Sequence, residues 1–432
     1  MRFLLMVLFP LLLAASASST DEENKPLLFT GAKVLDPSGE RWLDGRQVLI
    51  AGARIKSIAK EGGASTGKEN VLPDGTRRVD LKGLYLLPGL IDLHSHLLLH
   101  SYNETSWDDQ VLKEPLELRT IRAVAAARAT VEAGFTTLRD LGTEGAGFAD
   151  AALRDAIAAG LVPGPRLFAA TRAIVATGCY GPSGFDPRWD VPKGAQVADG
   201  VAGVRRAVRE QAAAGADWIK FYADYRRVKG GSATPTFSEE EVNAIVDEAR
   251  SAGLPVAAHA VTNEGIRRAV LAGVKTIEHG YGATSEVLSL MREHGVALCP
   301  TLSASEAIAR YAGWKGGKPE PPQVLEAKEM FTRAMASGVI IACGSDAGVF
   351  RHGENAREIE LMAAYGMPAA GALRAATSTA ASVLGKGNDL GRLADGYIAD
   401  IIAVRSDPLQ DVSALRQPVL VMKEGQIVLD RR

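Results

Sequence analysis

The stretch RSAGLPVAAHAVTNEGIRRAVLAGVKTIEHG (residues 250–280) contains the repeating unit on which the fold prediction rests. An Ala-rich helical pattern ends at Gly253 and again at Gly273, and each time a short, mostly apolar run follows at once. Glycine takes most readily the positive φ with which helices commonly end. Helix, glycine and buried strand in alternation are typical of a parallel sheet whose strands are joined by crossover helices.

The same unit recurs from about residue 118 to residue 345. Its helix-ending glycines are Gly134, Gly160, Gly215, Gly253, Gly273, Gly295 and Gly338. A further strand in LYLLPGLIDLHSH (84–96) brings the predicted strands to eight, which favours a (β/α)8 TIM barrel over residues 83–385. An open doubly wound sheet fits less well, because its first strand should lead into a glycine-rich phosphate turn, and this sequence has none there.

Both ends of the chain have a different pattern. Residues 27–82 and 396–432 contain short alternating runs separated by turn residues, without helical periodicity. We expect them to combine into one small β-sandwich domain, with residues 18–82 as its N-terminal part and 386–432 as its C-terminal part. Leu87-Pro88-Gly89 and Gly385-Lys386-Gly387 are the expected links to the barrel.

Composition excludes several classes of protein. The 432 residues include 49 Lys and Arg and 51 Asp and Glu, a formal net charge of −2, which argues against a nucleic-acid partner. With 47% hydrophobic and 23% charged residues, the chain has the composition of a globular protein. Three cysteines without CxxC spacing make neither a disulfide framework nor a thiolate zinc motif.

The N-terminus has the pattern of a secretory signal peptide. Arg2 precedes an unbroken apolar run from Phe3 to Leu13, and Ala15-Ser16-Ala17 follows as a cleavage site. The run is too short for a membrane span, which needs about 20 apolar residues. We therefore expect residues 1–17 to be removed and the mature protein to be secreted or periplasmic, with no membrane span.

Polar residues close most of the predicted barrel strands. His94 and His96 end the first strand, and because side chains alternate along a strand they share one face. The later strands end in or carry Lys220 (fourth), His259 (fifth), His279 (sixth) and Asp346 (eighth). Catalytic groups of such barrels lie at the carboxyl ends of the strands.

Each of these residues also has a simpler interpretation. A single strand-end histidine is more often a structural hydrogen-bonding group, Lys220 could extend from its strand to solvent, and Asp346 could cap the next helix. The six side chains together, on five strands, predict a metal site instead, because imidazole and carboxylate groups are common ligands of zinc.

Four stretches resemble the metal-dependent amidohydrolase superfamily: PGLIDLHSH (88–96), the strand with Lys220, AAHAVTNEGIRRAVLAGVKTIEHG (257–280) and GSDAG (344–348). The similarity extends over nearly the whole mature chain, from LFTGAKVLD (28–36) to DIIAVRSDPLQD (400–411). It is closest to the imidazolonepropionase-like and Xaa-Pro dipeptidase-like branch, which includes ochratoxin-hydrolysing amidases.

The resemblance implies two divalent metal ions, with zinc expected, although the ligand types also suit manganese or cobalt. His94 and His96 would hold the buried ion, and His259 and His279 the more exposed one. Lys220, as an N6-carboxylated lysine, would bridge both ions. Carbamate formation needs a neutral amine, so Lys220 must lie where its pKa is depressed.

The same resemblance gives Asp346 two roles, as a ligand of the first ion and as the group that shuttles a proton from the attacking water. Many relatives carry a Gly-Gly-His-Gly stretch after the third strand, whose histidine is thought to stabilise the tetrahedral intermediate. This chain has Thr177-Gly178-Cys179-Tyr180-Gly181 instead. Tyr180 is a candidate substitute, and Tyr222 is the other candidate donor; barrel-rim packing is the alternative role of Tyr222.

A substrate carboxylate needs a cation at the mouth of the barrel, for which arginine is well suited. The predicted loops supply Arg172, Arg226, Arg227 and His352. Each also fits a solvated loop charge. His294 lies at a helix end and His100 in the loop after the first strand, and neither receives a role.

These observations lead to the hypothesis of an amidohydrolase that cleaves the amide bond to a C-terminal amino acid. Dipeptides such as Xaa-Pro, N-acyl amino acids and ochratoxin-like amides are the expected substrates. The same site acting on a lactone, a cyclic amide or a phosphotriester is the alternative, and a periplasmic metal-binding protein is the non-enzymatic one. The resemblance further implies a homo-oligomer, often an octamer.

Overall fold

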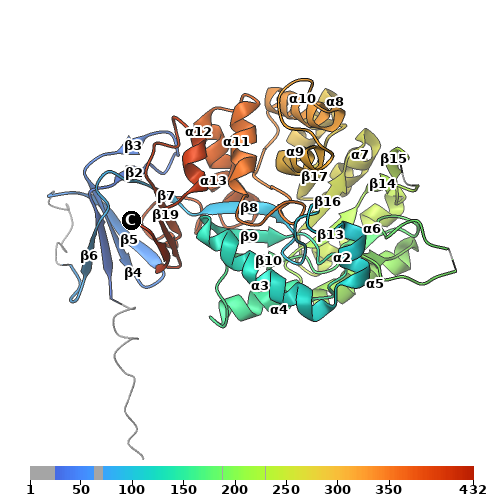
Figure 1. Cartoon of the computed structure of the whole chain (residues 1–432), viewed down its shortest axis with the longest axis horizontal. Helices are drawn as coiled ribbons and strands as arrows, with labels where there is room; N and C mark the ends of the chain where they lie inside the picture. The colour runs from blue at the N-terminus through green and yellow to red at the C-terminus, as the bar shows by residue number, and fades with distance from the viewer. Residues whose placement is uncertain (1–24, 63–71, 187, 229) are drawn as a thin grey trace, which may run out of the picture.

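The computed structural model describes residues 25–62, 72–186, 188–228 and 230–432. The predicted signal peptide, residues 1–17, lies outside these ranges. Two bodies lie side by side, a β-sandwich formed by both ends of the described chain and a larger α/β barrel (Figure 1). None of the helices in the described ranges is long and apolar enough to cross a membrane.

Strands from both ends of the chain build the sandwich, as predicted. One sheet has the order β5-β4-β1-β6, with β1 (Leu27–Thr30), β4 (Arg46–Ala51), β5 (Arg54–Lys60) and β6 (Arg77–Asp80). The other has the order β21-β20-β19-β7-β2-β3, with β2 (Lys33–Leu35), β3 (Trp42–Leu43), β7 (Tyr85–Pro88), β19 (Ile401–Val404), β20 (Leu420–Lys423) and β21 (Gln426–Asp430). A separate apolar core lies between the sheets, with Phe29, Ile55 and Met422 fully buried.

The stretch 84–96 holds two strands where the sequence predicts one. β7 pairs with β2 and β19 in the sandwich, and β8 (Leu90–Ser95) begins the barrel after Gly89. A Cβ on Gly89 would lie 2.2 Å from Oγ1 of Thr136, so only glycine fits at this passage. The continuous apolar run hides the change of sheet because both strands are buried.

The barrel follows the predicted order of strands. They are β8, β9 (Phe135–Asp140), β10 (Arg166–Ala169), β13 (Ile219–Tyr222), β16 (Val256–Ala260), β17 (Thr276–His279), β18 (Ala297–Cys299) and the segment 341–344. The last segment pairs with β18 through Leu298 and Ile341, and a hydrogen bond from Leu93 N to Cys343 O (2.9 Å) joins it to β8. Asp217 N donates to Ala169 O between β10 and β13.

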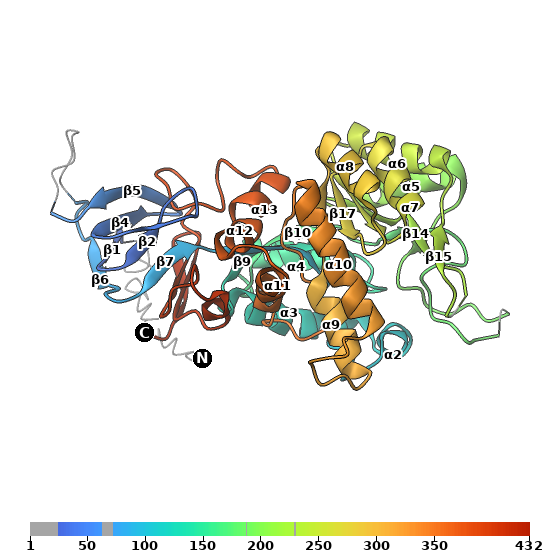
Figure 2. The ribbon, with the colours of Figure 1, turned by 90° about the horizontal axis from the view of Figure 1, so that it is seen from above.

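Helices surround these strands (Figure 2). They are α2 (Trp107–Lys113), α3 (Leu116–Glu132), α4 (Ala149–Ala158), α5 (Gly200–Ala213), α6 (Glu239–Ser251), α7 (Asn263–Ala272), α8 (Ser285–Glu293), α9 (Leu302–Tyr311), α10 (Pro322–Ser337), α11 (Ala356–Ala364), α12 (Ala369–Ala375) and α13 (Ser378–Val383). Short pieces β11 (Ile174–Val175), β12 (Gln196–Val197) and the hairpin β14 (Asp224–Arg226) and β15 (Ala233–Pro235) lie in the loops, and the 3-10 helix η1 (Val412–Arg416) precedes β20.

All seven predicted helix-ending glycines have positive φ. Gly273 (φ 96°) and Gly338 (φ 71°) are left-handed caps of α7 and α10, with backbone N–H groups turned back to the last helical carbonyls. These turns direct the chain from each helix into the next strand. The strands therefore present their carboxyl ends to one face of the barrel, where the candidate site lies.

Candidate active site

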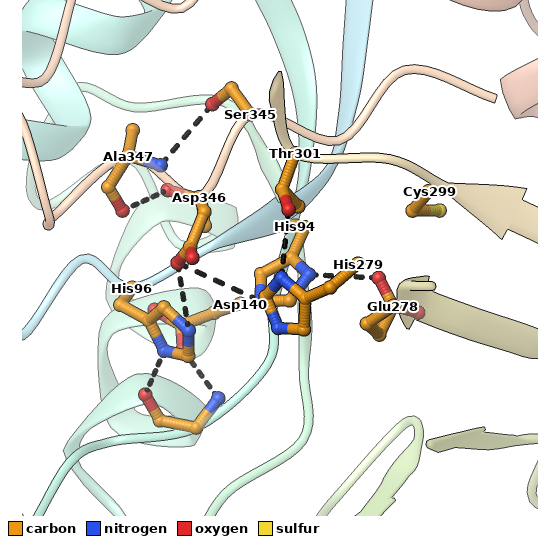
Figure 3. A network of polar contacts seen from close by, with 12 residues as sticks. His94, His96, Asp140, Glu278, His279, Cys299, Thr301, Ser345, Asp346 and Ala347 are labelled. Atoms are coloured by element: carbon orange, nitrogen blue, oxygen red, sulfur yellow. Dashed lines mark hydrogen bonds and ion pairs between the residues drawn. The ribbon is translucent and has the colours of Figure 1, made fainter. Parts of the chain in front are cut away.

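Five of the six predicted metal ligands lie at or next to the carboxyl ends of barrel strands, and Lys220 lies within its strand, two residues before the end. The six are His94 and His96 from β8 and the residue after it, Lys220 in β13, His259 in β16, His279 at the end of β17 and Asp346 after the eighth strand. Figure 3 shows His94, His96, His279 and Asp346 converging from these strands. His94, His96, Lys220 and Asp346 are buried, and His259 and His279 are partly buried, so one side of the group is open.

The side chains are close enough to share ions. His94, His279 and Asp346 each offer one ligand atom, and these atoms lie within 4.8 Å of one another. Oδ1 of Asp346 is 3.4 Å from Nε2 of His96 and 3.7 Å from Nε2 of His94. The rings of His259 and His279 lie 4.5 Å apart between centroids. The four histidines and Asp346 therefore gather at a single mouth.

Neighbouring groups fix three of the imidazoles through their Nδ1 atoms. The contacts are His94 with Oε2 of Glu278 (2.8 Å), His96 with the carbonyl of Gly142 (2.9 Å) and His279 with Oγ1 of Thr301 (2.7 Å). A histidine that donates through Nδ1 keeps the lone pair of Nε2 for a metal. The Glu278 carboxylate and the Gly142 carbonyl accept hydrogen bonds, so they select this tautomer for His94 and His96. The Thr301 hydroxyl can donate or accept, so its contact orients His279 without selecting a tautomer.

Burial also prepares these groups for a metal. It lowers the pKa of His94, His259 and His279 well below the usual value, so all three are neutral imidazoles at neutral pH. Burial lowers the pKa of Lys220 to about 8 and raises the pKa of Asp346 to about 6. An amine with this pKa is partly uncharged near neutral pH, as carbamate formation requires.

The donor set fits a divalent ion that accepts nitrogen and oxygen ligands, such as zinc. Neutral imidazoles, a carboxylate and a lysine that can take up CO2 meet at the barrel mouth. His259 and His279 are partly exposed to solvent. The donor types at the mouth therefore fit the ions that the family resemblance implies.

Five non-glycine residues in and around this mouth adopt left-handed backbone conformations. They are Glu144 (φ 52°), Tyr180 (φ 43°), His279 (φ 71°), Thr301 (φ 50°) and Asp346 (φ 64°). Such conformations cost about 1–3 kcal/mol each and persist where the surroundings determine them, often at functional sites. Strand alternation alone does not set the direction of His279 or Asp346, because the chain turns at both residues.

The two candidate hydroxyl donors lie beside the metal group. Tyr222 stacks on His259 with ring centroids 4.5 Å apart, and Tyr180 packs on Tyr222 at 4.3 Å. The hydroxyl of Tyr180 donates to the carboxylate of Glu144. Of these two tyrosines, Tyr222 is therefore the one in contact with a candidate metal ligand. Tyr180 contacts Tyr222 and Glu144 instead.

Arg226 and Arg227 lie beside this tyrosine layer. They line a cavity of about 340 Å³ together with Trp107, Tyr180 and Tyr225. The guanidinium of Arg226 lies 5.2 Å from the ring centroid of Tyr225. Both arginines thus line the same cavity as Tyr180, which packs on Tyr222.

Arg172 and His352 lie elsewhere. Arg172 stacks on Phe148 (4.6 Å) and pairs with Glu210 (3.3 Å). His352 is buried and contacts the Leu99 carbonyl through Nε2 (3.0 Å), and burial lowers its pKa to about 4. The structure does not bring Arg172 into the group, and it places His352 as a support of the loop after β8.

A polar layer beneath the ligands is absent from the sequence-based prediction. Arg139 is completely buried in the barrel and donates to Leu93 O (2.6 Å) and to Oε1 of Glu278 (2.9 Å). Asp92 accepts from Ser345 N (2.9 Å) and from Asn355 Nδ2 (2.7 Å). The only sequence signal was the presence of charged residues inside strands that are otherwise apolar.

The sequence matches a known family of hydrolases and a characterised relative. The model of the Amidohydrolase family matches residues 85–428. The ochratoxinase of Aspergillus niger is 30% identical over 438 aligned residues, covering 94% of this chain and 86% of the relative.

Solved structures of a dipeptidase and of a prolidase also resemble this chain over nearly its whole length. A Xaa-Pro dipeptidase with methionine bound in its active site superposes with a TM-score of 0.81 at 33% identity, covering 93% of this chain and 99% of the other. A prolidase complexed with N-methylphosphonate-L-proline superposes with a TM-score of 0.79 at 32% identity, covering 94% and 100% of the two chains.

Proposed function

The chain belongs to the amidohydrolase family and is a hydrolase of amide bonds, and from this premise we propose the finer assignment that follows. The enzyme uses two divalent metal ions, expected to be zinc, to cleave the amide bond between an acyl group and a C-terminal amino acid. The observation that carries the proposal is the convergence of His94, His279 and Asp346, whose ligand atoms lie within 4.8 Å of one another at the barrel mouth.

His94 and His96 would hold one ion and His259 and His279 the other, with N6-carboxylated Lys220 between them. When bound, the two ions would lower the pKa of a water and polarise the substrate carbonyl. The chain's own residues then have defined tasks. Asp346 would accept a proton from the attacking water and pass it to the leaving nitrogen.

The tyrosine layer and the nearby arginines fit the remaining requirements. Tyr222 lies against His259 and would offer a hydroxyl to the developing negative charge on the substrate oxygen. Arg226 would capture the substrate carboxylate by a charge-assisted hydrogen bond. The relatives, an ochratoxinase and Xaa-Pro dipeptidases, support an amino acid on the leaving side.

A substrate panel tests the proposal. Purified protein loaded with zinc or manganese is given a Xaa-Pro dipeptide, an N-acyl amino acid and an ochratoxin-like amide of phenylalanine, beside a lactone, a cyclic amide and a phosphotriester. We expect turnover of at least one amide of a C-terminal amino acid. Turnover only of the lactone, cyclic amide or phosphotriester would replace the proposed bond, and metal uptake without any turnover would favour a binding protein.

We also propose that the mature protein is secreted or periplasmic and forms a homo-oligomer, with an octamer as the implied assembly. N-terminal sequencing of exported protein tests the first point, and light scattering of the purified protein tests the second.

A further inference from the structure

Glu144 is a buried carboxylate with one oxygen left unpartnered. It lies in the loop after β9, is 1% exposed and has a φ of 52°. Its Oε2 accepts from Nε1 of Trp107 (2.8 Å) and from the hydroxyl of Tyr180. Its Oε1 has no hydrogen-bond partner among the described residues. A buried polar atom without a partner is uncommon and calls for a physical reason.

The unpartnered oxygen lies beside a proposed metal ligand. Oε1 of Glu144 is 3.6 Å from Nδ1 of His96, whose other ring nitrogen, Nε2, is 3.4 Å from Asp346. Nδ1 is already engaged with the Gly142 carbonyl at 2.9 Å. Glu144 therefore acts on His96 through charge and does not form its main hydrogen bond.

Glu278, the carboxylate that contacts His94, differs from Glu144 in having a buried cation as its partner. Glu278 contacts His94 directly, and Arg139 neutralises it at 2.9 Å. In the described part of the chain, the only cation-forming side chain within 4.0 Å of the Glu144 carboxylate is His96. The nearby Arg119 donates to main-chain carbonyls, including that of Glu144 itself.

A buried negative charge is stable only when a positive charge opposes it. We propose that Glu144 is a positioning residue whose charge is matched to the cation held by His96, so that it strengthens metal binding at that histidine. The inference rests on the proposed metal site. Second-layer groups around metal ligands typically change metal affinity by 10–100-fold.

A purely structural role makes a different prediction. If Glu144 served only to anchor Trp107 and Tyr180, a neutral isostere would keep that function, because the amide oxygen of glutamine still accepts both hydrogen bonds. Metal affinity would then stay at the wild-type value. A substitution of Glu144 that removes the charge and keeps the shape therefore distinguishes an effect on metal binding from an anchoring role.

The experiment uses Glu144→Gln, Glu144→Asp and the control Asp400→Asn in the full-length protein. Asp400 is also a buried carboxylate, but its partner is Arg166 at the junction of barrel and sandwich (2.5 Å). Each protein is stripped of metal, its thermal midpoint is measured, and zinc affinity is obtained by competition with a chromophoric chelator. No substrate is involved, so a failure of the proposed hydrolytic function leaves this result unaffected.

We expect Glu144→Gln to bind zinc about 10–100-fold more weakly, while its metal-free thermal midpoint equals or exceeds that of the wild type, because an uncompensated charge is gone. Glu144→Asp, which keeps the charge, should lose less affinity. Asp400→Asn should melt lower and bind zinc like the wild type. Zinc affinity of Glu144→Gln within about twofold of wild type, or a Glu144→Gln protein that fails to fold, would overturn the proposal.

Discussion

Oε2 of Glu278 contacts Nδ1 of His94 at 2.8 Å while Oε1 of the same carboxylate accepts from Arg139 at 2.9 Å. All three side chains are at most 1% exposed. One carboxylate therefore joins a fully buried guanidinium in the barrel interior to a candidate metal ligand at the mouth. Stability of the barrel and orientation of His94 depend on the same group.

Glu278→Gln should therefore lower both stability and metal affinity. Removing the charge leaves Arg139 buried without its ion-pair partner, which costs about 3–5 kcal/mol of unfolding free energy. Denaturant unfolding of metal-free protein measures the loss. Glu264→Gln is the matched control, because Glu264 pairs with Arg267 and Arg268 at the surface and such pairs contribute about 0–1 kcal/mol. Equal effects of the two substitutions would contradict the interpretation.

Asp346→Asn should abolish hydrolysis while leaving most of the metal bound. The amide keeps a ligand oxygen but cannot accept a proton, and general acid–base groups contribute about 10²–10⁴-fold to rate. Steady-state kcat and elemental analysis of the same preparation measure the two quantities. A variant with wild-type kcat would refute the assigned role of Asp346, and a metal-free variant would show that ligation is its main task.

Activation of metal-free protein by zinc and CO2 should depend on pH through Lys220. Burial lowers the pKa of its amine to about 8. The protonated form dominates below that value and cannot form a carbamate, so the neutral fraction falls about tenfold for each pH unit below 8 and levels off above it. The activation rate at fixed dissolved CO2 should follow this fraction. A rate independent of pH from about 6 to 9 would argue against carboxylation of Lys220.

Gly344→Ala should disturb the site through packing. A Cβ at Gly344 would lie 2.9 Å from Cβ of His94, which is too close for non-bonded carbon atoms, and 3.0 Å from Cβ of Cys299, which is a very tight contact. Overpacking of this kind costs about 1–3 kcal/mol, and His94 must move, which weakens zinc binding. Gly203→Ala is the control, because its Cβ has open space within α5; it should be neutral or stabilising. Unchanged zinc affinity in Gly344→Ala would show that the mouth tolerates the shift.

The fold could be predicted because it follows from local patterns in the sequence, whereas the ligand set stays a prediction. Gly273 and the run that ends at His279 identify a helix, a turn and a strand within one short stretch, and repetition of that unit gives the barrel. The sequence places a link between sandwich and barrel at Leu87-Pro88-Gly89, where the structure has it. It does not show that the apolar run around Gly89 forms two strands in different sheets, because both strands are equally apolar and buried.

The second layer of the site lies beyond such patterns. Glu144 and Thr301 reach His96 and His279 only because loops from different strands meet at the barrel mouth. Nothing in their own neighbourhoods along the chain indicates those contacts. Arg172 shows the converse, since a cation in a suitable loop turned instead to Phe148 and Glu210.

The pairing of β7 with β19 has a consequence for how the molecule is made. β7 leads through Gly89 directly into β8, the strand that carries His94, yet its neighbour β19 begins only at Ile401. A ribosome must therefore finish almost the entire chain before that neighbour emerges. A polypeptide ending ahead of Ile401 would present β7 with a bare edge, open to pairing with other chains.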